Sequence, residues 1–202
     1  MKKGVVYGII LSLLINQYAL AAEKKKPIEL SSSQAHWNLT KKTLGFTIGA
    51  FTGLIWHEFG HQTMAWMTGN NMNWDLPNGK WTCIHNKDGL RTVALGGFGA
   101  QIISTEIILS IPQIPKGNSF ILGWLAWNIT HPIFYTIRNE IDPGGYGDLK
   151  IIQKTGLQSE YVETALIIHA FISAVRLYKN PDFPLFVKTT HKEIVTGFSW
   201  RW

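Results

Sequence analysis

Four long stretches of apolar residues recur along the chain, separated by short polar or turn-forming segments. The first, residues 44–67, is rich in small residues, contains no proline and stops just before Gly69, as helices often do. Three more follow at 92–111, 119–137 and 161–178, each 18 to 20 residues long. This length fits a helix buried in a core and equally a helix that crosses a bilayer. The pattern predicts a mostly α-helical fold, which we expect to be a membrane-embedded bundle.

A different pattern separates the first and second stretches. Residues 71–84 carry an Asn78-Gly79 pair between two arms that contain aromatic residues. Asn-Gly is the strongest short-range signal for a tight hairpin turn, so we expect a small β-hairpin here. Later in the chain, the Asp-Pro-Gly-Gly run at residues 142–145 predicts a turn before a short segment that begins near Asp148.

The N-terminus has the composition of a segment that directs export. A short basic start, an apolar run over residues 4–15 and the small residues Ala19 and Ala21 fit a secretory signal peptide spanning residues 1–21. The alternative is an uncleaved helix over residues 5–22 that anchors the chain. In both cases we expect an exported protein of the cell membrane or the periplasm.

The composition of the chain indicates its domain organisation and excludes several classes of protein. Residues 22–40 include a lysine run, a proline and a serine triplet and are expected to form a linker before a single helical domain over residues 41–202. Only 16% of the residues are charged and 46% are hydrophobic, which excludes a disordered chain and favours burial or contact with a lipid bilayer. The net charge of +6 is scattered, so nothing supports binding to nucleic acid. The single cysteine, Cys83, excludes an intrachain disulfide.

Candidate chemistry is concentrated in an H-E-x-x-H sequence, His57-Glu58-Phe59-Gly60-His61, inside the first predicted helix. Residues four apart share one helix face, so the two imidazoles can bind one metal ion. Zinc suits two neutral histidine nitrogens plus a carboxylate, with a fourth position for water, and Glu58 can take a proton from that water. A chance pairing of histidines is disfavoured, because unpaired polar groups are costly in an apolar helix. We therefore predict His57 and His61 as Zn²⁺ ligands and Glu58 as the catalytic base.

The third ligand must be a carboxylate or an imidazole that the fold brings close. Asp148 is the leading candidate, because a carboxylate at the start of a helix is favourably placed and remains free to bind metal. Glu106 is the main alternative, since an ionised carboxylate in an apolar helix needs a metal or a basic partner; Asp142 ranks third. Gln101, five residues before Glu106, is expected to point elsewhere on that helix and is a weak candidate for polar support.

The remaining histidines receive structural interpretations. His131 and His169 lie in apolar stretches, where a hydrogen-bonded interior histidine is the more common case. His36, His85 and His191 lie in polar or loop-like sequence, where a solvated histidine is expected.

These motifs resemble the site-2 protease group of membrane-embedded metalloproteases, in which HExGH lies on a membrane helix and an Asp from a later N-x-x-P-x-x-x-x-D-G segment completes a zinc site. HEFGH matches the first motif. In the second, Asn139 and Pro143 precede Asp148 with the family's interval from Pro to Asp, but the interval from Asn to Pro is one residue longer and Leu149 replaces the following Gly. The resemblance implies zinc on the two histidines, Glu58 as base, and a peptide bond in or near the membrane as substrate.

The sequence supports two functions. The first is a zinc-dependent, membrane-associated peptidase that uses a metal-activated water to hydrolyse a peptide bond in a peptide or membrane-protein substrate. The second is a noncatalytic, metal-stabilised envelope protein with a structural or partner-binding role, because a hydrolytic motif does not itself show turnover.

Overall fold

The computed structural model describes residues 32–75, 80–83, 87–142, 146–181, 185–189 and 194–198, so the predicted signal peptide lies outside the described residues. The described elements, in chain order, are α2 (Ser32–Met67), β1 (Met72–Asp75), β2 (Lys80–Cys83), α3 (Lys87–Ser110), α4 (Ser119–Ile141), α5 (Asp148–Lys154), α6 (Ser159–Tyr178), β3 (Leu185–Thr189) and β4 (Ile194–Phe198). The fold is mostly α-helical with small antiparallel sheets, which confirms the predicted helical class.

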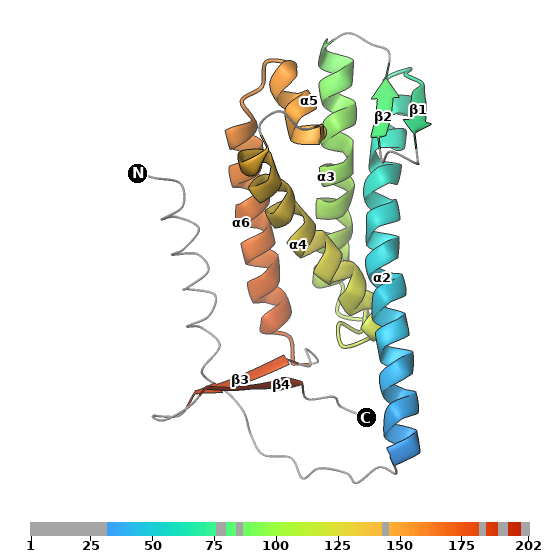
Figure 1. The fold of residues 1–202 in the computed structure, drawn as a ribbon, viewed down its shortest axis with the longest axis vertical. Helices are drawn as coiled ribbons and strands as arrows, with labels where there is room; N and C mark the ends of the chain where they lie inside the picture. Colours follow the sequence, from blue (N-terminus) through green and yellow to red (C-terminus); the bar gives the residue numbers. More distant parts are fainter. Residues whose placement is uncertain are drawn as a thin grey trace.

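The long helices lie side by side along the molecule (Figure 1). α2, α3 and α6 follow its long axis, and α4 crosses them obliquely while packing on both α2 and α6. The short helix α5 and the β1–β2 hairpin lie at one end, and the β3–β4 hairpin lies at the other. The end that carries α5 therefore also receives the C-terminal half of α2 and the N-terminal half of α3.

Glycines let the backbone of α2 approach its two neighbours closely. A Cβ on Gly49 would overlap the carbonyl oxygen of Phe120 on α4. Further along α2, a Cβ on Gly60 would overlap the carbonyl oxygen of Gly96 on α3, and a Cβ on Gly96 would lie 2.5 Å from the Gly60 carbonyl oxygen. Small residues at helix contacts are typical of membrane helices, which associate through close packing rather than through the hydrophobic effect.

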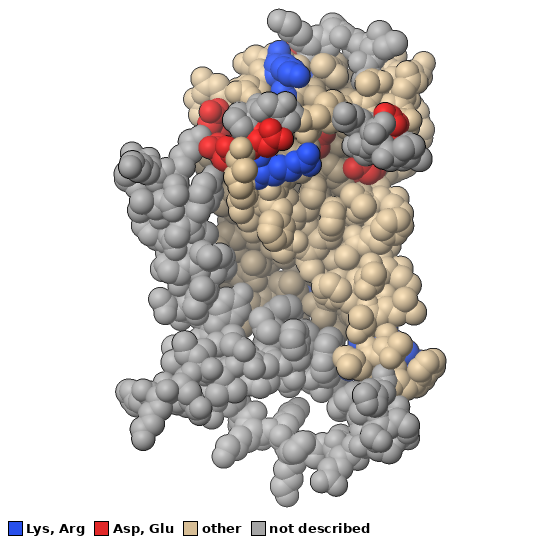
Figure 2. Space-filling model, viewed as in Figure 1, with Lys and Arg blue, Asp and Glu red and all other residues tan. Residues whose placement is uncertain are grey.

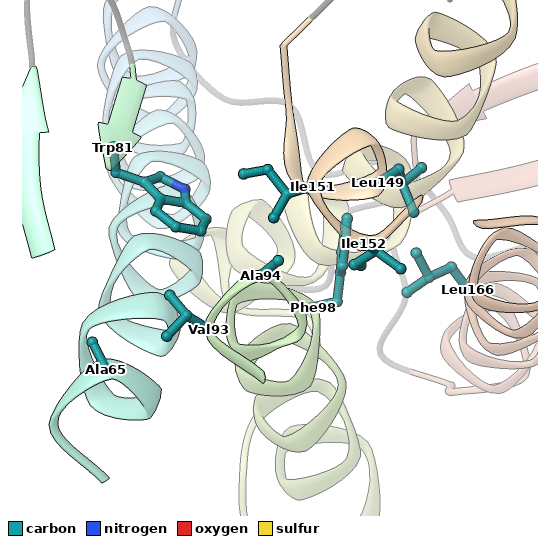
Figure 3. Packing of buried hydrophobic residues seen from close by; sticks show 9 residues of the cluster. All are labelled: Ala65, Trp81, Val93, Ala94, Phe98, Leu149, Ile151, Ile152 and Leu166. Carbon is teal, nitrogen blue, oxygen red and sulfur yellow. The ribbon is translucent and has the colours of Figure 1, made fainter. Parts of the chain in front are cut away.

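Two clusters of buried apolar side chains hold the helices together. The first joins the C-terminal part of α2 to β2, α3, α5 and α6, and Figure 3 shows it around Phe98 and Ile152. Its fully buried members are Ala65, Trp81, Val93, Ala94, Phe98, Leu149, Ile151, Ile152 and Leu166. The second cluster joins α3, α4 and α6 and contains Ile108, Leu122, Leu125, Ile129, Ala170 and Leu177. The first cluster fixes α5, and with it Asp148, against α3.

The hairpin predicted after the first helix is present. β1 pairs antiparallel with β2, with Trp74 opposite Trp81, while the Asn-Gly pair itself lies outside the described residues. Two features differ from the prediction. α2 begins at Ser32 rather than at residue 44, so the end of the expected linker is helical, because residues 34–43 contain good helix formers and no glycine or proline. The hairpin of β3 and β4 was not predicted, although both strands are rich in β-branched and aromatic residues.

The helices expose large apolar side chains to an unusual degree for a protein in water. α2 alone exposes a row of them along much of its length: Leu44, Ile48, Phe51, Ile55, Phe59 and Trp66. Two of the described helices, Asp88–Ser110 and Ser159–Tyr178, are long and apolar enough to cross a membrane. On the face shown in Figure 2, most of the visible charged side chains gather near the end of the molecule that carries α5.

Candidate metal centre

Three side chains predicted as metal ligands lie together at the end of the bundle that carries α5. His57 and His61 occupy successive turns on one face of α2, and Asp148 is the first residue of α5. All three residues are buried, with at most 3% of their surface exposed. Within the described part of the chain they form a group whose ligand atoms all lie within 4.8 Å of one another, so the group could hold a metal ion.

The spacing of the ligand atoms suits a small tetrahedral ion. The two Nε2 atoms of His57 and His61 lie 3.2 Å apart, and the Oδ2 atom of Asp148 lies 3.2 Å from the first and 3.4 Å from the second. A tetrahedral ion with ligands at ~2.0–2.1 Å would place neighbouring ligand atoms about 3.3 Å apart. The three atoms therefore already stand at the separations that such an ion requires.

The hydrogen bond behind His61 strengthens this reading. Its Nδ1 lies 2.7 Å from the backbone carbonyl oxygen of Val93. A carbonyl oxygen can only accept, so Nδ1 carries the proton, and in the neutral ring Nε2 presents a bare lone pair. That lone pair faces a carboxylate oxygen of Asp148, which is also only an acceptor when ionised. A cation between these two acceptors, either a proton or a metal ion, would make this close approach favourable.

A glycine keeps the space in front of the two imidazoles open. A Cβ on Gly97 of α3 would lie 2.6 Å from the Nε2 atom of His61 and 2.7 Å from that of His57. Any larger residue at this position would occupy the volume beside both ligand nitrogens. The residues present therefore fit a bound metal ion both in donor type and in free space.

Asp148 is held in place from two sides. Its backbone N–H donates to the hydroxyl of Tyr135 on α4, at 2.6 Å. The preceding residue, Gly147, has φ of 156°, and a Cβ there would overlap the same hydroxyl, so the turn into α5 needs a glycine. Burial would raise the pKa of the Asp148 carboxyl, but without a metal ion a protonated His61 and hydrogen bonds from both imidazoles outweigh burial and hold that pKa well below its usual value. The side chain therefore stays a carboxylate.

Glu58, the predicted base, lies next to His57 on α2 and is half-buried. Among the residues that the structure describes, its carboxylate has neither an ion pair nor a hydrogen-bond partner. The carboxylate is thus close to the candidate ligands in sequence and is not committed to a structural contact in the described part of the chain.

The two other carboxylates considered as third ligands are not part of this group. Glu106 of α3 instead binds two side chains of α6: its Oε2 accepts from Arg176 at 2.6 Å and its Oε1 lies 3.1 Å from Nε2 of His169. Asp142 caps the C-terminus of α4 and is exposed. The histidine at 169, expected to be an interior residue with a hydrogen-bond partner, has one in Glu106. Residues 85 and 191 and the side chain at position 36 lie outside the described residues.

Sequence reasoning underrated Gln101. This residue is 1% exposed, and its Oε1 atom lies 3.0 Å from Nδ1 of His57 and 3.3 Å from Nδ1 of His131. The prediction considered Gln101 only in relation to Glu106 on the same helix. The side chains that Gln101 contacts lie instead on α2 and α4. His131 does have the polar partner expected of an interior histidine, but it stands beside the candidate metal ligands, with its ring centroid 4.8 Å from that of His57.

Asn139, which the resemblance to the site-2 protease group singled out, donates a hydrogen bond to Glu163 of α6 at 2.6 Å. No protein-family model matches the chain, and no curated protein and no solved structure matches it significantly.

Proposed function

We propose that this protein is a zinc-dependent membrane peptidase that resembles the site-2 protease group. The main support is one observation: the buried ligand atoms of His57, His61 and Asp148 stand 3.2 to 3.4 Å apart, with two imidazole nitrogens against one carboxylate oxygen. Such an arrangement favours a bound cation, and its two histidines belong to an H-E-x-x-H sequence on a helix.

The donor set supports zinc among the common ions. Two imidazoles and one carboxylate suit zinc, whereas magnesium and calcium prefer oxygen ligands throughout. The same three donors also suit ferrous iron. The glutamate that directly follows the first histidine favours zinc, because in H-E-x-x-H sites it serves hydrolysis as the general base.

Within the described residues the group offers three protein ligands rather than four, which supports a catalytic site. Structural zinc sites are closed by four protein ligands, and catalytic sites keep one position open for water or substrate. Among the described residues, His131 has its ring beside that of His57, but it does not belong to the group of ligand atoms. When bound, zinc would polarise a peptide carbonyl and make water acidic enough to attack at neutral pH.

The chain's own residues would then handle the proton. The carboxylate of Glu58 would accept a proton from the attacking water and return it to the nitrogen of the leaving amine, so that the peptide bond breaks without a charged amide leaving group. Asp148, held as a carboxylate, would contribute one negative charge to the ligand set. The two histidines would contribute none, because each would bind through a neutral ring.

The surface supports a location in a membrane. Two helices are long and apolar enough to span it, the face of α2 described above exposes a row of large apolar side chains, and glycines mediate the close helix contacts. With the predicted export signal, we assign the protein to the cell membrane, with the lipid bilayer as its surroundings and a peptide or membrane protein as substrate.

The test is to purify the full chain in detergent, reconstitute it in lipid vesicles, and measure metal content by mass spectrometry together with cleavage of a set of synthetic transmembrane peptides. We expect one zinc ion per chain. Glu58→Gln should keep the zinc and lower cleavage by about 10²–10⁴-fold, the usual contribution of a general base. Glu160→Gln, which changes an exposed glutamate in the first turn of α6, should alter neither quantity.

Two results would contradict the proposal. A folded chain that holds no zinc and takes up none when it is added would remove the metal site. A zinc-loaded chain that cleaves none of the peptides, and whose Glu58→Gln variant supports normal function in the cell, would instead establish the noncatalytic, metal-stabilised envelope protein.

A further inference from the structure

One side-chain oxygen lies within hydrogen-bond distance of two histidines at the candidate metal centre. The Oε1 atom of Gln101 on α3 lies 3.0 Å from Nδ1 of His57 on α2 and 3.3 Å from Nδ1 of His131 on α4. This amide thus joins three helices at one atom. The fold places it at the depth of the metal ligands, where the side chain is 1% exposed.

A carbonyl oxygen has two lone pairs and can accept from two N–H groups at once. If Oε1 accepts from both rings, each ring carries its proton on Nδ1, and each neutral ring has a bare Nε2. For His57 this is the tautomer that a metal ion requires, since Nε2 is the atom that faces Asp148. The opposite orientation of the amide would turn its NH₂ group toward His57 and move the ring proton to Nε2, where it would block a metal ion.

Contacts with neighbouring residues hold the backbone of Gln101 and the ring of His131 in place. Asn128 of α4 donates to the backbone carbonyl oxygen of Gln101 at 3.3 Å, and to the hydroxyls of Ser104 and Thr105. The ring of His131 stacks on Trp127, with centroids 4.9 Å apart and planes 17° apart. In the described part of the chain the Nε2 atom of Gln101 has no hydrogen-bond partner, so the accepting oxygen is the part of this amide that makes contacts.

We propose that Gln101 is a positioning residue that sets the tautomers of His57 and His131 together and thereby prepares His57 to bind metal. This inference rests on the proposed metal site. It adds a hydrogen-bond acceptor behind His57 that matches the Val93 carbonyl oxygen behind His61. Hydrogen bonds of this kind, made to the far nitrogen of a metal-binding histidine, orient the ring and raise its basicity.

The test uses two variants of similar size. Gln101→Met removes the acceptor and should weaken zinc binding by about 10–100-fold, the usual effect of losing such a partner. Gln101→Glu keeps acceptor oxygens, replaces the unpartnered donor and adds a negative charge that itself favours a bound cation, so it should bind zinc at least as tightly as the wild type. Gln158→Met, at an exposed position before α6, is the matched control and should bind zinc as the wild type does.

The zinc titration is paired with a measurement that needs no metal. Nitrogen NMR of the metal-free, ¹⁵N-histidine-labelled chain reports which ring nitrogen carries the proton. We expect Nδ1–H at His131 in the wild type and in Gln101→Glu, and a mixture of tautomers in Gln101→Met. Thermal unfolding of each metal-free variant verifies that it folds.

The outcomes separate the two proposals. Zinc affinity that is equal in wild type and a folded Gln101→Met, or that is lost in a folded Gln101→Glu, overturns the role of Gln101 while leaving the metal site standing. If the wild type binds no zinc, the proposed function fails, and the NMR result then decides the role of Gln101 alone: an unchanged tautomer in Gln101→Met overturns it.

Discussion

Two groups of polar side chains lie within the apolar helices of this bundle, and each joins a carboxylate to a histidine. In the first, Asp148 meets His57 and His61. In the second, Glu106 meets His169 and Arg176. The first group is buried, whereas the side chains of Glu106 and Arg176 in the second are 41% and 35% exposed.

The difference between the groups lies in the source of positive charge. Arginine is always protonated, so Arg176 gives Glu106 a permanent counter-charge at 2.6 Å and completes that group without any ligand. The buried group has no such residue. Its two histidines are neutral when their Nδ1 atoms alone carry protons, which leaves the charge of Asp148 to be balanced by a proton or a metal ion. A buried carboxylate that faces only imidazoles is therefore the better sign of a metal site.

The comparison predicts opposite effects of removing the two carboxylates. Asp148→Ala should weaken zinc binding by more than about 100-fold, since it removes a ligand and not merely a residue that supports one. Glu106→Ala should leave zinc content unchanged, because its partners lie outside the metal group. Both variants can be compared by metal analysis after detergent purification, with circular dichroism to verify the fold. Retention of zinc in Asp148→Ala, or its loss in a folded Glu106→Ala, would reverse the assignment.

A substitution with a smaller expected effect tests whether the space beside the two imidazoles is the space that the metal ion occupies. Gly97→Ala adds a Cβ that would lie 2.6–2.7 Å from the two ligand nitrogens, and we expect it to weaken zinc binding by at least about tenfold. Gly99→Ala is the control, because a Cβ there meets nothing within 4 Å and alanine favours the helix. Zinc titrations of the two variants should differ clearly. Equal affinities would mean that the space beside the imidazoles is not the space that the ion uses.

Removing the metal should lower the free energy of unfolding, and this loss should depend on the buried group of His57, His61 and Asp148 and not on Glu106. Zinc at a hundred times its dissociation constant contributes about 2.7 kcal/mol to stability. A change of this size lowers the Tm of a domain of 150–250 residues by about 5–10 °C. We expect a chelator to cause this drop in the wild type and in Glu106→Ala, but not in Asp148→Ala. Differential scanning calorimetry in detergent measures it, and a chelator effect that persists in Asp148→Ala would point to a different site.

Much of the fold and part of the site follow from local sequence. The helical period places His57 and His61 on one face of their helix whatever the position of that helix in the fold. The Asn-Gly pair predicted the first hairpin. Asp148 could be named because the turn before it and the short helix after it are both visible in the sequence. The start of α2 and the second hairpin were missed, since a serine triplet and a proline-containing tail outweighed local propensity in the interpretation.

The partners that depend on how helices rotate against one another could not be predicted. Gln101 and Glu106 lie five residues apart on α3. The sequence-based prediction took Glu106 as a possible metal ligand and Gln101 only as weak polar support. The structure turns Gln101 toward α2 and Glu106 toward α6. That rotation is set by which residues of α3 fit against α2, including the contact between Gly60 and Gly96, and a single sequence contains no direct record of it.

The glycine contact between α2 and α3 also bears on how the protein would respond to the lipid environment proposed for it. Gly60 directly precedes His61, and Gly96 directly precedes Gly97, so this close approach of the two backbones lies beside the candidate metal ligands. Backbone atoms in contact have no rotamers to exchange and no flexible side chain to compress. In the proposed membrane location, a change in bilayer thickness would alter the tilt of the helices, while this backbone contact would hold the distance between α2 and α3 at the candidate site.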